Sequence, residues 1–590
     1  MLESARRTHT CGQLRAEHAG TDVVLQGWVD GARDMGGVVF LDLRDRHGIT
    51  QITVDQRSPE AARELAAACR VEFVVEVVGQ AVPRANVNKR IPTGAIEVVA
   101  SELTILNRTK PLPFAPKDDV KASEETRLQY RYLDLRRPAL AKSLTVRHQA
   151  AQATRQYLDE EGFLEIETPV LTKATPEGAR DYLVPSRVHP STWYALPQSP
   201  QLFKQILMVA GMDRYFQIVK CFRDEDLRAD RQPEFTQIDI EMSFATREVV
   251  IEMAEGVVRA MWKRILGYDI PAIPHITYDE SMARYGKDAP DTRFGLEHID
   301  ILPAVVDTEF RVISGSLAGG GICKAIRVPG GAEGSSRKVL DGWTEFVRRY
   351  GMGGLLWGKV ADGKWAGPLG RLSEPEKAEV LALTGAEIGD LLLVGAGKAS
   401  TVNAGLGNLR IQVAKDRGLI PAGAFAFVWV TDFPAFDHDE EEDRWVAVHH
   451  PFTSPAVEHL PLLDTPERLG EVSSDAYDLV CNGYEIGGGS IRIHDPEVQR
   501  KVFSALGISD EEAQEKFGFL LEALAYGAPP HGGLAFGFDR CAMLLCGTDN
   551  IRDVIAFPKT TSAQCLLSGA PAGVPDKSLG ELHVANIKRP

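Results

Sequence analysis

The sequence predicts a multidomain α+β protein: a small β-barrel, then a domain built on an antiparallel sheet that is interrupted by an inserted α+β domain. Three observations lead to this prediction. The chain has 590 residues, enough for three or four domains. Short strand-like segments dominate residues 1–108 and return in residues 421–590, and a stretch of different texture lies at 288–420.

Composition and charge exclude several classes of protein. Apolar residues make up 44% and charged residues 25% of the chain, which excludes disordered and fibrous proteins. The formal net charge of −16 excludes a wholly basic nucleic-acid coat, but it leaves room for local basic surfaces. No apolar stretch approaches the roughly 20 residues that span a bilayer, and the N-terminus lacks the apolar core of a secretory signal. We therefore expect a cytoplasmic protein without a membrane partner.

The eight cysteines give no sign of a metal centre. They are scattered along the chain, without a CxxC pair and without a histidine nearby at zinc spacing. We expect reduced thiols that mostly fill cores, and no structural metal cluster.

Residues 1–108 are predicted to form a small closed barrel. The runs VVLQGWV, VVFLDL, ITQITV, FVVEVVG and AIEVVASELTIL are separated by glycine, aspartate, asparagine and proline. If the leucines of the second run face the core, Phe40 faces outward, and the same count turns Gln51 outward. An exposed phenylalanine beside Arg33, Arg44 and Gln51 suits the stacking and edge-reading of unpaired bases. The alternative is a phenylalanine covered by another loop.

The next segments divide the remainder of the chain. RTKPLPFAPKDDVKASEET has three prolines and mixed charge, so residues 109–140 are predicted to be a hinge. A helix should follow, with Leu144, His148 and Ala151 on one side and Gly162 at its end. Residues 141–287 mix strands and helices. Residues 288–420 carry no cluster that looks catalytic and are predicted to be the inserted domain, after which 421–590 continue the interrupted one.

The densest chemical signal lies between Tyr215 and Phe244. In QIDIEMSF (237–244) polar and apolar residues alternate, so a strand would present Asp239 on one face and its apolar residues on the other. A loop of about eleven residues joins this strand to the preceding one, and long loops are often functional. The loop carries Arg228, Arg231 and Gln232, enough to touch a polyanion. The alternative is a solvated strand face with a salt-bridged loop.

A helix is predicted to begin in ALPQSPQLFKQILMVAG. Ser199 is a suitable N-cap, and Pro200 suits the first helical position. Gln201, Lys204 and Met208 then share one side of the helix. Lys204 can offer a point charge to a carboxylate, although on its own it is better explained as a surface lysine.

A hairpin is predicted in AYDLVCNGYEIGGGSIRIHD, because Asn482-Gly483 favours a two-residue turn. That turn pairs Val480 with Glu485 and places Asp478 on the same face as Glu485, as its diagonal neighbour. Two carboxylates in this arrangement can share Mg²⁺ when phosphates supply further oxygens. The three glycines at 487–489 allow another chain or a ligand to approach the backbone closely. The alternative is a surface hairpin with incidental charges.

Two arginines and a histidine pair complete the candidate groups. Arg492 follows the three glycines and can hold a carboxylate through two hydrogen bonds. Arg540 lies on the first turn of a helix predicted from Asp539 to just before Gly547, where the helix dipole favours a phosphate. In isolation that short pattern is weak. His449-His450 have no third ligand at zinc spacing, so we expect hydrogen bonding to a polar ligand and not metal binding.

In this order, the clusters resemble those of class II aminoacyl-tRNA synthetases, specifically the bacterial-type aspartyl group. The three class motifs are matched by FLEIETPVLTKATPEGARD with Pro169, by FRDE…RQPEFTQID, and by GLAFGFDR. QSPQLFK and GGGSIRIH are similar to aspartyl-type segments, and 288–420 matches the insertion of the bacterial subgroup. The resemblance implies an OB-fold barrel at 1–108 that reads the anticodon, a hinge, a catalytic domain at 141–287 and 421–590, and a homodimer. It implies ATP-dependent activation of L-aspartate and its transfer to the 3′ end of tRNA(Asp).

The resemblance also implies a role for individual residues. Around L-aspartate it places Glu177, Ser199, Gln201, Lys204, Arg223, Asp239, His449, His450 and Arg492. Around ATP it places Arg223, Asp224, Glu225, Gln232, Phe235, Glu485, Gly537, Phe538, Asp539 and Arg540. It assigns catalysis to Arg223 and Arg540, Mg²⁺ to Asp478 and Glu485, and anticodon contacts to Arg33, Phe40 and Gln51.

One departure and two alternatives stay open. The family usually has asparagine or histidine followed by consecutive arginines after the barrel's Trp-Val pair, whereas this chain has Asp30-Gly31-Ala32 before a single Arg33. Whether tRNA(Asn) is charged as well is therefore undecided. A non-catalytic nucleic-acid-binding relative would have lost charges that Arg223, Glu225, Glu485 and Arg540 retain. Activation of asparagine or lysine is disfavoured, because Lys204 and Arg492 make a cationic pocket.

Overall fold

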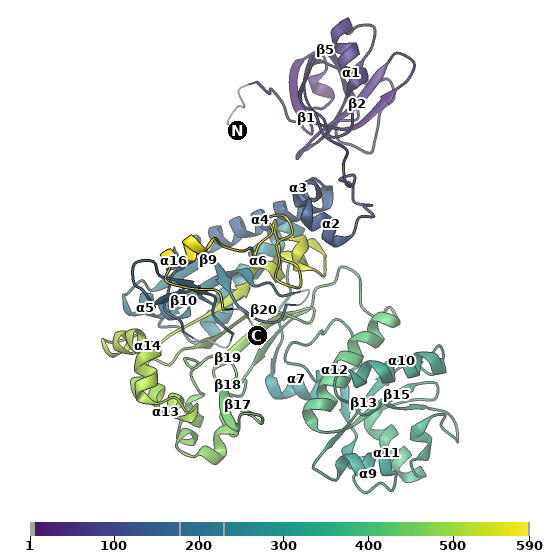
Figure 1. Cartoon of the computed structure of the whole chain (residues 1–590). Helices are drawn as coiled ribbons and strands as arrows, with labels where there is room; N and C mark the ends of the chain where they lie inside the picture. The colour runs from purple at the N-terminus through teal and green to yellow at the C-terminus, as the bar shows by residue number, and fades with distance from the viewer. Residues whose placement is uncertain (1–5, 176–178, 228–229, 588–590) are drawn as a thin grey trace. The chain divides into compact units, whose positions relative to one another are not determined.

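The computed structural model describes residues 6–175, 179–227 and 230–587, and the chain divides into two compact units. The first unit comprises Met1–Lys142 and Cys565–Ser568, and the second comprises Ser143–Gln564 and Gly569–Pro590. Figure 1 shows the ribbon of each.

The first unit contains the predicted barrel, and its five strands close completely. Its elements are η1 (Ala16–His18), β1 (Asp22–Asp34), β2 (Val39–Asp45), β3 (Gly48–Val54), α1 (Glu60–Ala68), β4 (Val74–Pro83) and β5 (Ile96–Asn107). The strand order is β1-β2-β3-β5-β4. Leu41, Leu43 and Ile52 are fully buried in the interior, as their alternation predicts. The expected barrel is therefore confirmed.

The hinge consists of two short helices that lead into a long one. These helices are α2 (Glu124–Gln129), α3 (Arg131–Asp134) and α4 (Pro138–Glu160). Val146, Ala150 and Leu158 form the buried side of α4, whereas His148 is exposed. Ala151 also packs against the core, so the predicted side coincides only in part with the buried one. Gly162 follows the helix with φ +77°, a conformation that glycine adopts without strain.

The second unit is organised around an eight-stranded sheet in the order β11-β16-β19-β20-β21-β10-β9-β6. The strands are β6 (Leu164–Glu165), β9 (Arg214–Phe222), β10 (Glu234–Ser243), β11 (His275–Thr277), β16 (Phe427–Thr431), β19 (Ala476–Cys481), β20 (Tyr484–Ile491) and β21 (His531–Gly537). All neighbouring pairs are antiparallel except β6 with β9 and β11 with β16, at the two edges. The predicted antiparallel sheet is thus present, with parallel edges.

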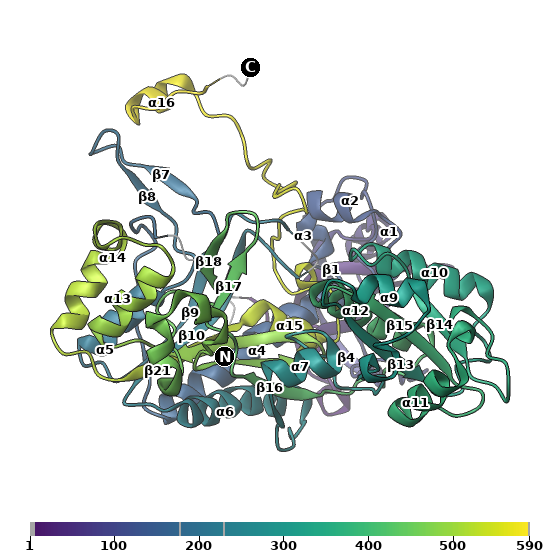
Figure 2. The ribbon, with the colours of Figure 1, turned by 90° about the horizontal axis from the view of Figure 1, so that it is seen from below.

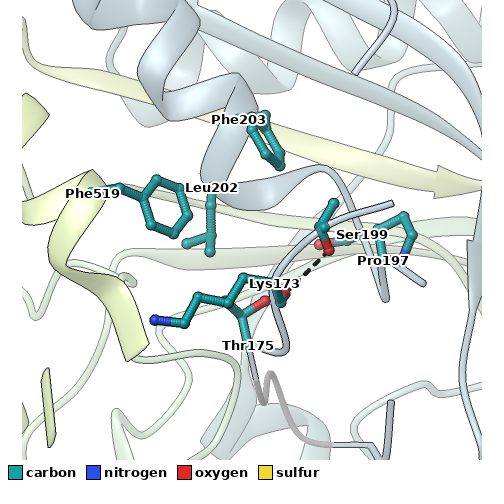
Figure 3. A pocket seen from close by; sticks show the side chains of 8 residues that line it. Lys173, Thr175, Pro197, Ser199, Leu202, Phe203 and Phe519 are labelled. Atoms are coloured by element: carbon teal, nitrogen blue, oxygen red, sulfur yellow. Dashed lines mark hydrogen bonds between the residues drawn. The ribbon is translucent and has the colours of Figure 1, made fainter. Parts of the chain in front are cut away.

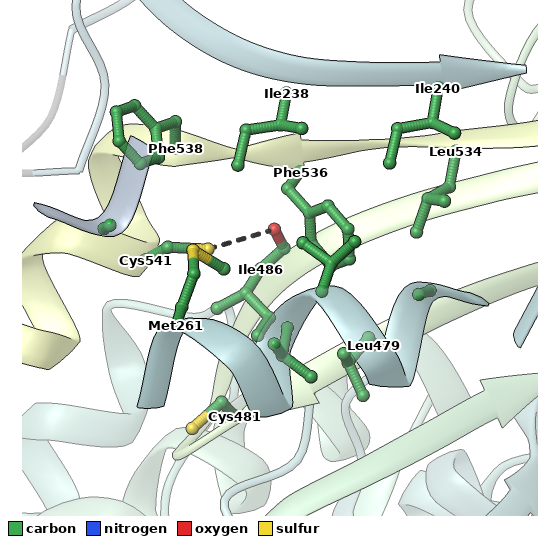
Figure 4. Close-up of a cluster of buried hydrophobic side chains, with 14 of the residues drawn as sticks. Ile238, Ile240, Met261, Leu479, Cys481, Ile486, Leu534, Phe536, Phe538 and Cys541 are labelled. Atoms are coloured by element: carbon green, nitrogen blue, oxygen red, sulfur yellow. Dashed lines mark hydrogen bonds between the residues drawn. The ribbon is translucent and has the colours of Figure 1, made fainter. Parts of the chain in front are cut away.

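Helices cover one face of this sheet and leave the other for polar side chains. α6 (Arg247–Leu266) and α15 (Phe538–Cys546) pack with α4 against the apolar face. Figure 4 shows Ile238 and Ile240 of β10 and Phe536 of β21 in this core, with Met261 of α6. Each fully buried side chain of this size contributes about 1.5–3 kcal/mol. On the opposite face β10 carries its acidic residues, and α5 (Gln201–Val209) packs against β9 and β10 there.

The stretch predicted as an insertion has a sheet of its own. Four antiparallel strands run in the order β12-β13-β15-β14. The elements are α7 (Tyr278–Tyr285) before it, then β12 (His298–Asp300), α8 (Leu302–Val305), α9 (Arg311–Leu317), β13 (Ile322–Val328), α10 (Arg337–Arg348), β14 (Leu356–Lys359), η2 (Pro368–Arg371), α11 (Glu374–Thr384), β15 (Leu391–Gly397) and α12 (Ala399–Asp416). Alternate residues of its strands belong to two separate apolar clusters, for example Leu392 to one and Leu393 to the other. The sheet is therefore covered on both faces.

The remaining elements of the second unit are mostly short. They are β7 (Leu183–Pro185), β8 (Trp193–Ala195), β17 (Phe436–Asp439), β18 (Arg444–Ala447), η3 (Val457–Asp464), η4 (Pro466–Glu471), α13 (Pro496–Ala505), α14 (Asp510–Ala525), η5 (Ile551–Asp553) and α16 (Asp576–Glu581). Figure 2 shows the β7–β8 hairpin reaching away from the sheet. Among the described residues, every helix is too short or too polar to span a bilayer.

Candidate active site

Four charged side chains from three elements meet on the polar face of the sheet. Lys204 of α5 donates from Nζ to Asp239 Oδ1 over 2.7 Å and lies 3.3 Å from Glu241 Oε2. Arg492, directly after β20, donates from Nε and Nη2 to the two oxygens of Glu241 over 2.9 and 3.1 Å. All four side chains are at most 2% exposed. The surface-lysine explanation of Lys204 is therefore wrong, because α5 lies directly over β10.

Glu241 is a site residue that the sequence motifs did not single out. It shares a strand face with Asp239, since the two are separated by one residue of β10. That alternation was the available signal. The cations beside Glu241, Arg492 first and then Lys204, outweigh its burial and lower its pKa. Burial dominates at Asp239 and raises its pKa, although Lys204 opposes the shift.

The two adjacent histidines have different partners. His450 accepts from Arg492 Nη1 at Nε2 over 2.9 Å, and its burial together with the charge of Arg492 keeps its pKa well below the usual value. His449 Nε2 lies 3.8 Å from Asp478 Oδ1. Burial lowers the pKa of His449, but the nearby Asp478 carboxylate outweighs this effect and the net pKa is raised. The pKa values of the two histidines are therefore shifted in opposite directions.

The start of α5 differs by one residue from the expectation. The helix begins at Gln201, with Pro200 as its N-cap, and Ser199 Oγ accepts from the Gln201 backbone N–H over 3.2 Å. Gln201, Lys204 and Met208 share one side of the helix, as predicted, and all three are buried. Gln201 donates to Gln205, which contacts His531 over 3.1 Å, so these two further residues support the pocket. The predicted Glu177 lies outside the described residues.

An apolar cavity of about 200 Å³ adjoins this region. Figure 3 shows it between α5, α14 and the loop at 172–175, with Phe203 and Phe519 on one side and Ser199 on the other. Leu202, next to Gln201, also lines it. The cavity therefore lies at the start of α5, the helix that also carries Lys204.

The two arginines expected to contact phosphates lie at the same end of the large sheet, where β9 and β21 end and β10 and β20 begin. Arg223 follows β9, and its guanidinium carbon lies 5.0 Å from the centre of the Phe235 ring. Arg540 on α15 donates to the Glu485 carbonyl over 2.8 Å and to Asp230 over 3.2 Å. The predicted loop lies between the end of β9 at Phe222 and the start of β10 at Glu234, and Arg228 lies outside the described residues.

Several residues assigned to ATP by resemblance have protein partners. Glu225 pairs with Arg231 over 3.2 Å, and the Asp224 backbone N–H donates to the Arg180 carbonyl over 3.1 Å. Gln232 exchanges two hydrogen bonds with the Lys559 main chain. Gly537 ends β21, pairing with Gln237. Phe538 is buried in the core, and the Asp539 carboxylate is engaged by Arg147 and the Thr236 main chain.

The hairpin places two carboxylates around one point. Val480 pairs with Glu485 as predicted, but an irregularity at Ile486 puts Asp478 opposite Gly488. A Cβ on Gly488 would lie 2.5 Å from Asp478 Oδ1 and 3.3 Å from Glu485 Oε1. Partial burial and the charge of Asp478 raise the pKa of Glu485. Two carboxylates in this arrangement would fit Mg²⁺ if phosphate oxygens completed its coordination shell. Among the described residues, no three His, Cys, Asp or Glu side chains lie close enough together to hold a metal ion by themselves.

Buried polar atoms without a partner are found among the predicted site residues. Within the described part of the chain, Asp239 Oδ2, Arg223 Nε and His449 Nδ1 are buried and make no hydrogen bond. Since such atoms cost free energy, about 1–3 kcal/mol each, a ligand that satisfies them is favoured. These atoms supply an acceptor, a cationic donor and a ring nitrogen for a polar ligand.

The barrel face is only partly as the alternation predicts. Phe40 is partly exposed and pairs across the strands with Arg33, which contacts Asp42 over 3.1 Å. Gln51 is 4% exposed, because it donates to Glu97 over 2.8 Å and accepts from Arg84 over 2.6 Å. The prediction that Gln51 is exposed is therefore wrong: side chains from neighbouring segments cover it.

Arg44 is also buried and not available on this face of the barrel. It is 8% exposed and pairs with Glu72 over 2.6 Å and with Asp30. Asp30 lies at an irregularity of β1, between Val29 and Gly31. Asp30 therefore neutralises an arginine of the barrel.

Comparison with known proteins identifies the family of the chain. The family model described as "tRNA synthetases class II (D, K and N)" matches residues 123–561, and one described as "OB-fold nucleic acid binding domain" matches residues 23–106. An aspartate–tRNA ligase of Macrococcus caseolyticus is 53% identical over 582 residues, covering 98% of each chain. An aspartate–tRNA(Asp/Asn) ligase of Nitratidesulfovibrio vulgaris is 53% identical over 583 residues, covering 98% of this chain and 94% of that one.

A solved structure shares the fold. The asparaginyl-tRNA synthetase from Pyrococcus horikoshii, complexed with asparaginyl-adenylate, has a TM-score of 0.59 at 19% identity, covering 95% of this chain and 99% of that one. This likeness concerns the architecture alone. With the family match over residues 123–561, the chain belongs to the class II tRNA synthetases of the D, K and N group, with an OB-fold nucleic-acid binding domain.

Proposed function

We propose that this enzyme is an aspartate–tRNA ligase, which activates L-aspartate with ATP and transfers it to the 3′ end of tRNA(Asp). The observation that carries the proposal is the buried Lys204 and Arg492 on the sheet face where Asp239 Oδ2 has no partner among the described residues. Relatives named aspartate–tRNA ligase that are 53% identical over nearly the whole chain support the same substrate. We expect the enzyme to act in the cytoplasm.

The charges of the pocket favour aspartate over its amide. The two cations supply donors for the side-chain carboxylate, and the free Asp239 oxygen accepts from the α-ammonium group. Asparagine would present an amide N–H₂ to Lys204 and Arg492, leaving charged donors poorly matched. A site built on such donors discriminates by about 10⁴–10⁵. Lysine would bring a third cation into the pocket.

Adenylation requires alignment and charge stabilisation more than a strong base. The α-carboxylate of aspartate is already ionised; its oxygen attacks the α-phosphorus, a new P–O bond forms, and pyrophosphate leaves with the electrons of the broken P–O bond. Arg223 and Arg540 stabilise the negative charge that spreads over the phosphates. Asp478 and Glu485 would hold Mg²⁺, which supplies positive charge to the phosphate oxygens.

In the second step the ribose hydroxyl of the terminal adenosine attacks the carbonyl carbon of the adenylate. The ester forms, AMP leaves, and the hydroxyl proton passes to the leaving phosphate or to solvent. The protein's contribution is again to orient the reacting groups. Ser199, just before α5, lines the adjoining cavity.

The OB-fold barrel is assigned to the anticodon. Phe40, with its partly exposed ring, suits base stacking, and Arg33 suits contact with the RNA. Gln51 can contact RNA only if its bonds to Arg84 and Glu97 open. Asp30 neutralises Arg44 and so removes positive charge from the barrel. If the enzyme also charges tRNA(Asn), we expect the cause to lie in residues 30–35 and 85–94.

A second copy of the chain completes the proposed assembly. Leu164, Val170 and Leu171 of the first class motif are each about half exposed, and β6 lies at the sheet edge. Exposed apolar side chains at a strand edge favour association. Sedimentation equilibrium should give a dimer, and Leu164→Glu should give monomers.

Pyrophosphate exchange with aspartate, asparagine and lysine tests the activity. Exchange with aspartate alone supports the assignment, and exchange with another of the three instead contradicts it. Charging of purified tRNA(Asp) and tRNA(Asn) side by side then tests the RNA substrate. Charging of both would mean that the enzyme does not distinguish tRNA(Asp) from tRNA(Asn).

A further inference from the structure

One buried carboxylate joins three segments of the catalytic domain. Asp539 lies on the first turn of α15 and is 4% exposed. Its Oδ1 accepts from Arg147 Nη1 of α4, and its Oδ2 accepts from the Thr236 backbone N–H of β10 over 2.8 Å. Asp539 and its two partners come from segments that correspond to the first, second and third class motifs and their flanks.

Both phosphate-directed arginines are immediate neighbours of this contact. Thr236 follows Phe235, whose ring lies 5.0 Å from the guanidinium of Arg223. Asp539 precedes Arg540, whose guanidinium reaches the Glu485 carbonyl and Asp230. The two hydrogen bonds of Asp539 therefore connect the β10 end that supports Arg223 to the helix turn that presents Arg540.

Arg147 keeps this carboxylate paired. Its guanidinium carbon lies 4.7 Å from the centre of the Phe538 ring, and Nη1 also lies 3.5 Å from the Val554 carbonyl. The Arg147 side chain is 20% exposed, and that of Asp539 is 6% exposed, so the pair is mostly shielded from water. Loss of either partner would leave the other charge without compensation, and such losses are strongly destabilising.

We propose that Arg147 and Asp539 are positioning residues, which fix Arg223 and Arg540 at the separation needed to hold ATP. Asp539 then contributes to ATP binding without touching the nucleotide. The proposal rests on the proposed function for its substrate, but it concerns the geometry of the ATP side alone. Because Arg147 belongs to α4, the position of this helix would also affect where Arg223 and Arg540 lie.

Asp539→Asn is the primary test. Asparagine keeps the size and an oxygen that can accept from Thr236, but it removes the charge that Arg147 needs. Misplacement of catalytic groups by about 1 Å costs about 100-fold in rate, so we expect kcat/KM for ATP in pyrophosphate exchange to fall by about 10- to 100-fold. The KM for aspartate should change less than that for ATP, because Arg223 is expected to border both substrates but Arg540 only ATP. Arg147→Lys, which retains the charge, should lose less activity than Arg147→Met.

Asp390→Asn is the matched control. In the inserted domain Asp390 pairs with Arg327 over 2.7 Å and accepts from the Gly330 backbone N–H over 2.8 Å, so it reproduces the chemistry of Asp539 away from the site. Its exchange kinetics should equal those of the wild type. Active-site titration and thermal unfolding of all variants separate a misplaced site from a smaller folded fraction.

Equilibrium binding of ATP without amino acid separates this proposal from the function assigned above. Weaker binding to Asp539→Asn than to Asp390→Asn is expected, whichever amino acid the enzyme activates. Unchanged ATP kinetics in Asp539→Asn overturn the positioning role, and so does a loss that disappears after correction for the active fraction. Wild-type exchange that does not respond to aspartate overturns the proposed function instead.

Discussion

Arg492 and Glu241 form a doubly hydrogen-bonded pair that is sealed from solvent, with side chains that are 2% and 0% exposed. Arg492 Nη1 also donates to His450 and Ser490, over 2.9 and 2.7 Å. Within the described part of the chain these contacts use four of the five guanidinium N–H groups and leave one on Nη2. The arginine is therefore held rigidly by protein partners, with one donor remaining for a ligand.

Arg492→Leu should abolish aspartate activation while ATP binding remains measurable. The variant removes the donor that distinguishes a carboxylate, and it leaves Glu241 buried without its main partner. Breaking a buried pair in this way costs about 3–5 kcal/mol, so thermal unfolding must be measured beside pyrophosphate exchange and ATP binding. The double variant Glu241→Gln with Arg492→Leu removes the unpaired charge and should recover stability, but not activity. Equal loss of ATP binding and aspartate activation in that folded double variant would contradict the role of Arg492.

His450 should make the enzyme less stable in acid. Its pKa in the folded protein is well below the ordinary value of 6.5, because of burial and the charge of Arg492. The unfolded chain therefore binds a proton at this residue first, and the stability that neutral His450 provides is lost as the pH falls below about 6.5. Urea unfolding of His450→Gln between pH 5 and 8 should show a shallower acid loss than the wild type. The exposed His148→Gln on α4 is the control and should keep the wild-type slope. The same slope in His450→Gln would contradict the assignment.

Phe40→Ala should raise the KM for tRNA and leave pyrophosphate exchange unchanged. A stacked base contributes about 1–3 kcal/mol on alanine substitution, so an increase of about tenfold or more is expected. Tyr350→Ala, an exposed aromatic residue of the inserted domain, serves as the control. A slower first half-reaction in Phe40→Ala would mean that this residue does more than read the anticodon.

These sites also show how far the sequence alone was sufficient. The alternation in β10 correctly separated Asp239 from the core residues, and Asn482-Gly483 correctly set the pairing of Val480 with Glu485. Both signals are local, because strand period and turn type depend on adjacent residues.

Burial by distant segments could not be read in this way. Lys204 is buried because α5 lies over β10, and Gln51 is covered by side chains far along the chain. The irregularity at Ile486 likewise changes the partner of Asp478 without a signal in the turn. Tertiary packing decides these features, and one-dimensional patterns do not contain it.

Gly488→Ala should disturb Mg²⁺ use while the fold survives. The added methyl would lie 2.5 Å from Asp478 Oδ1, the end of a flexible side chain, so the carboxylate moves and the backbone does not. Because the same methyl would lie 3.3 Å from Glu485 Oε1, both proposed metal ligands are displaced from their common point. We expect a Mg²⁺ titration of pyrophosphate exchange to require more metal and to reach a lower maximum, with little change in thermal unfolding.

Gly489→Ala is the contrasting variant, since its methyl would lie 2.1 Å from the Gly533 carbonyl oxygen of β21. A backbone atom in a central strand cannot turn aside, so this variant should be destabilised by about 1–3 kcal/mol or more. The glycines at 487–489 were expected to let another chain or a ligand approach the backbone. At Gly489 the group that comes close is the neighbouring strand, and at Gly488 it is the pair of carboxylates. If Gly488→Ala shows wild-type Mg²⁺ dependence and a wild-type maximum, Asp478 and Glu485 do not hold the metal, and the charge that stabilises the phosphates has to come from the arginines alone.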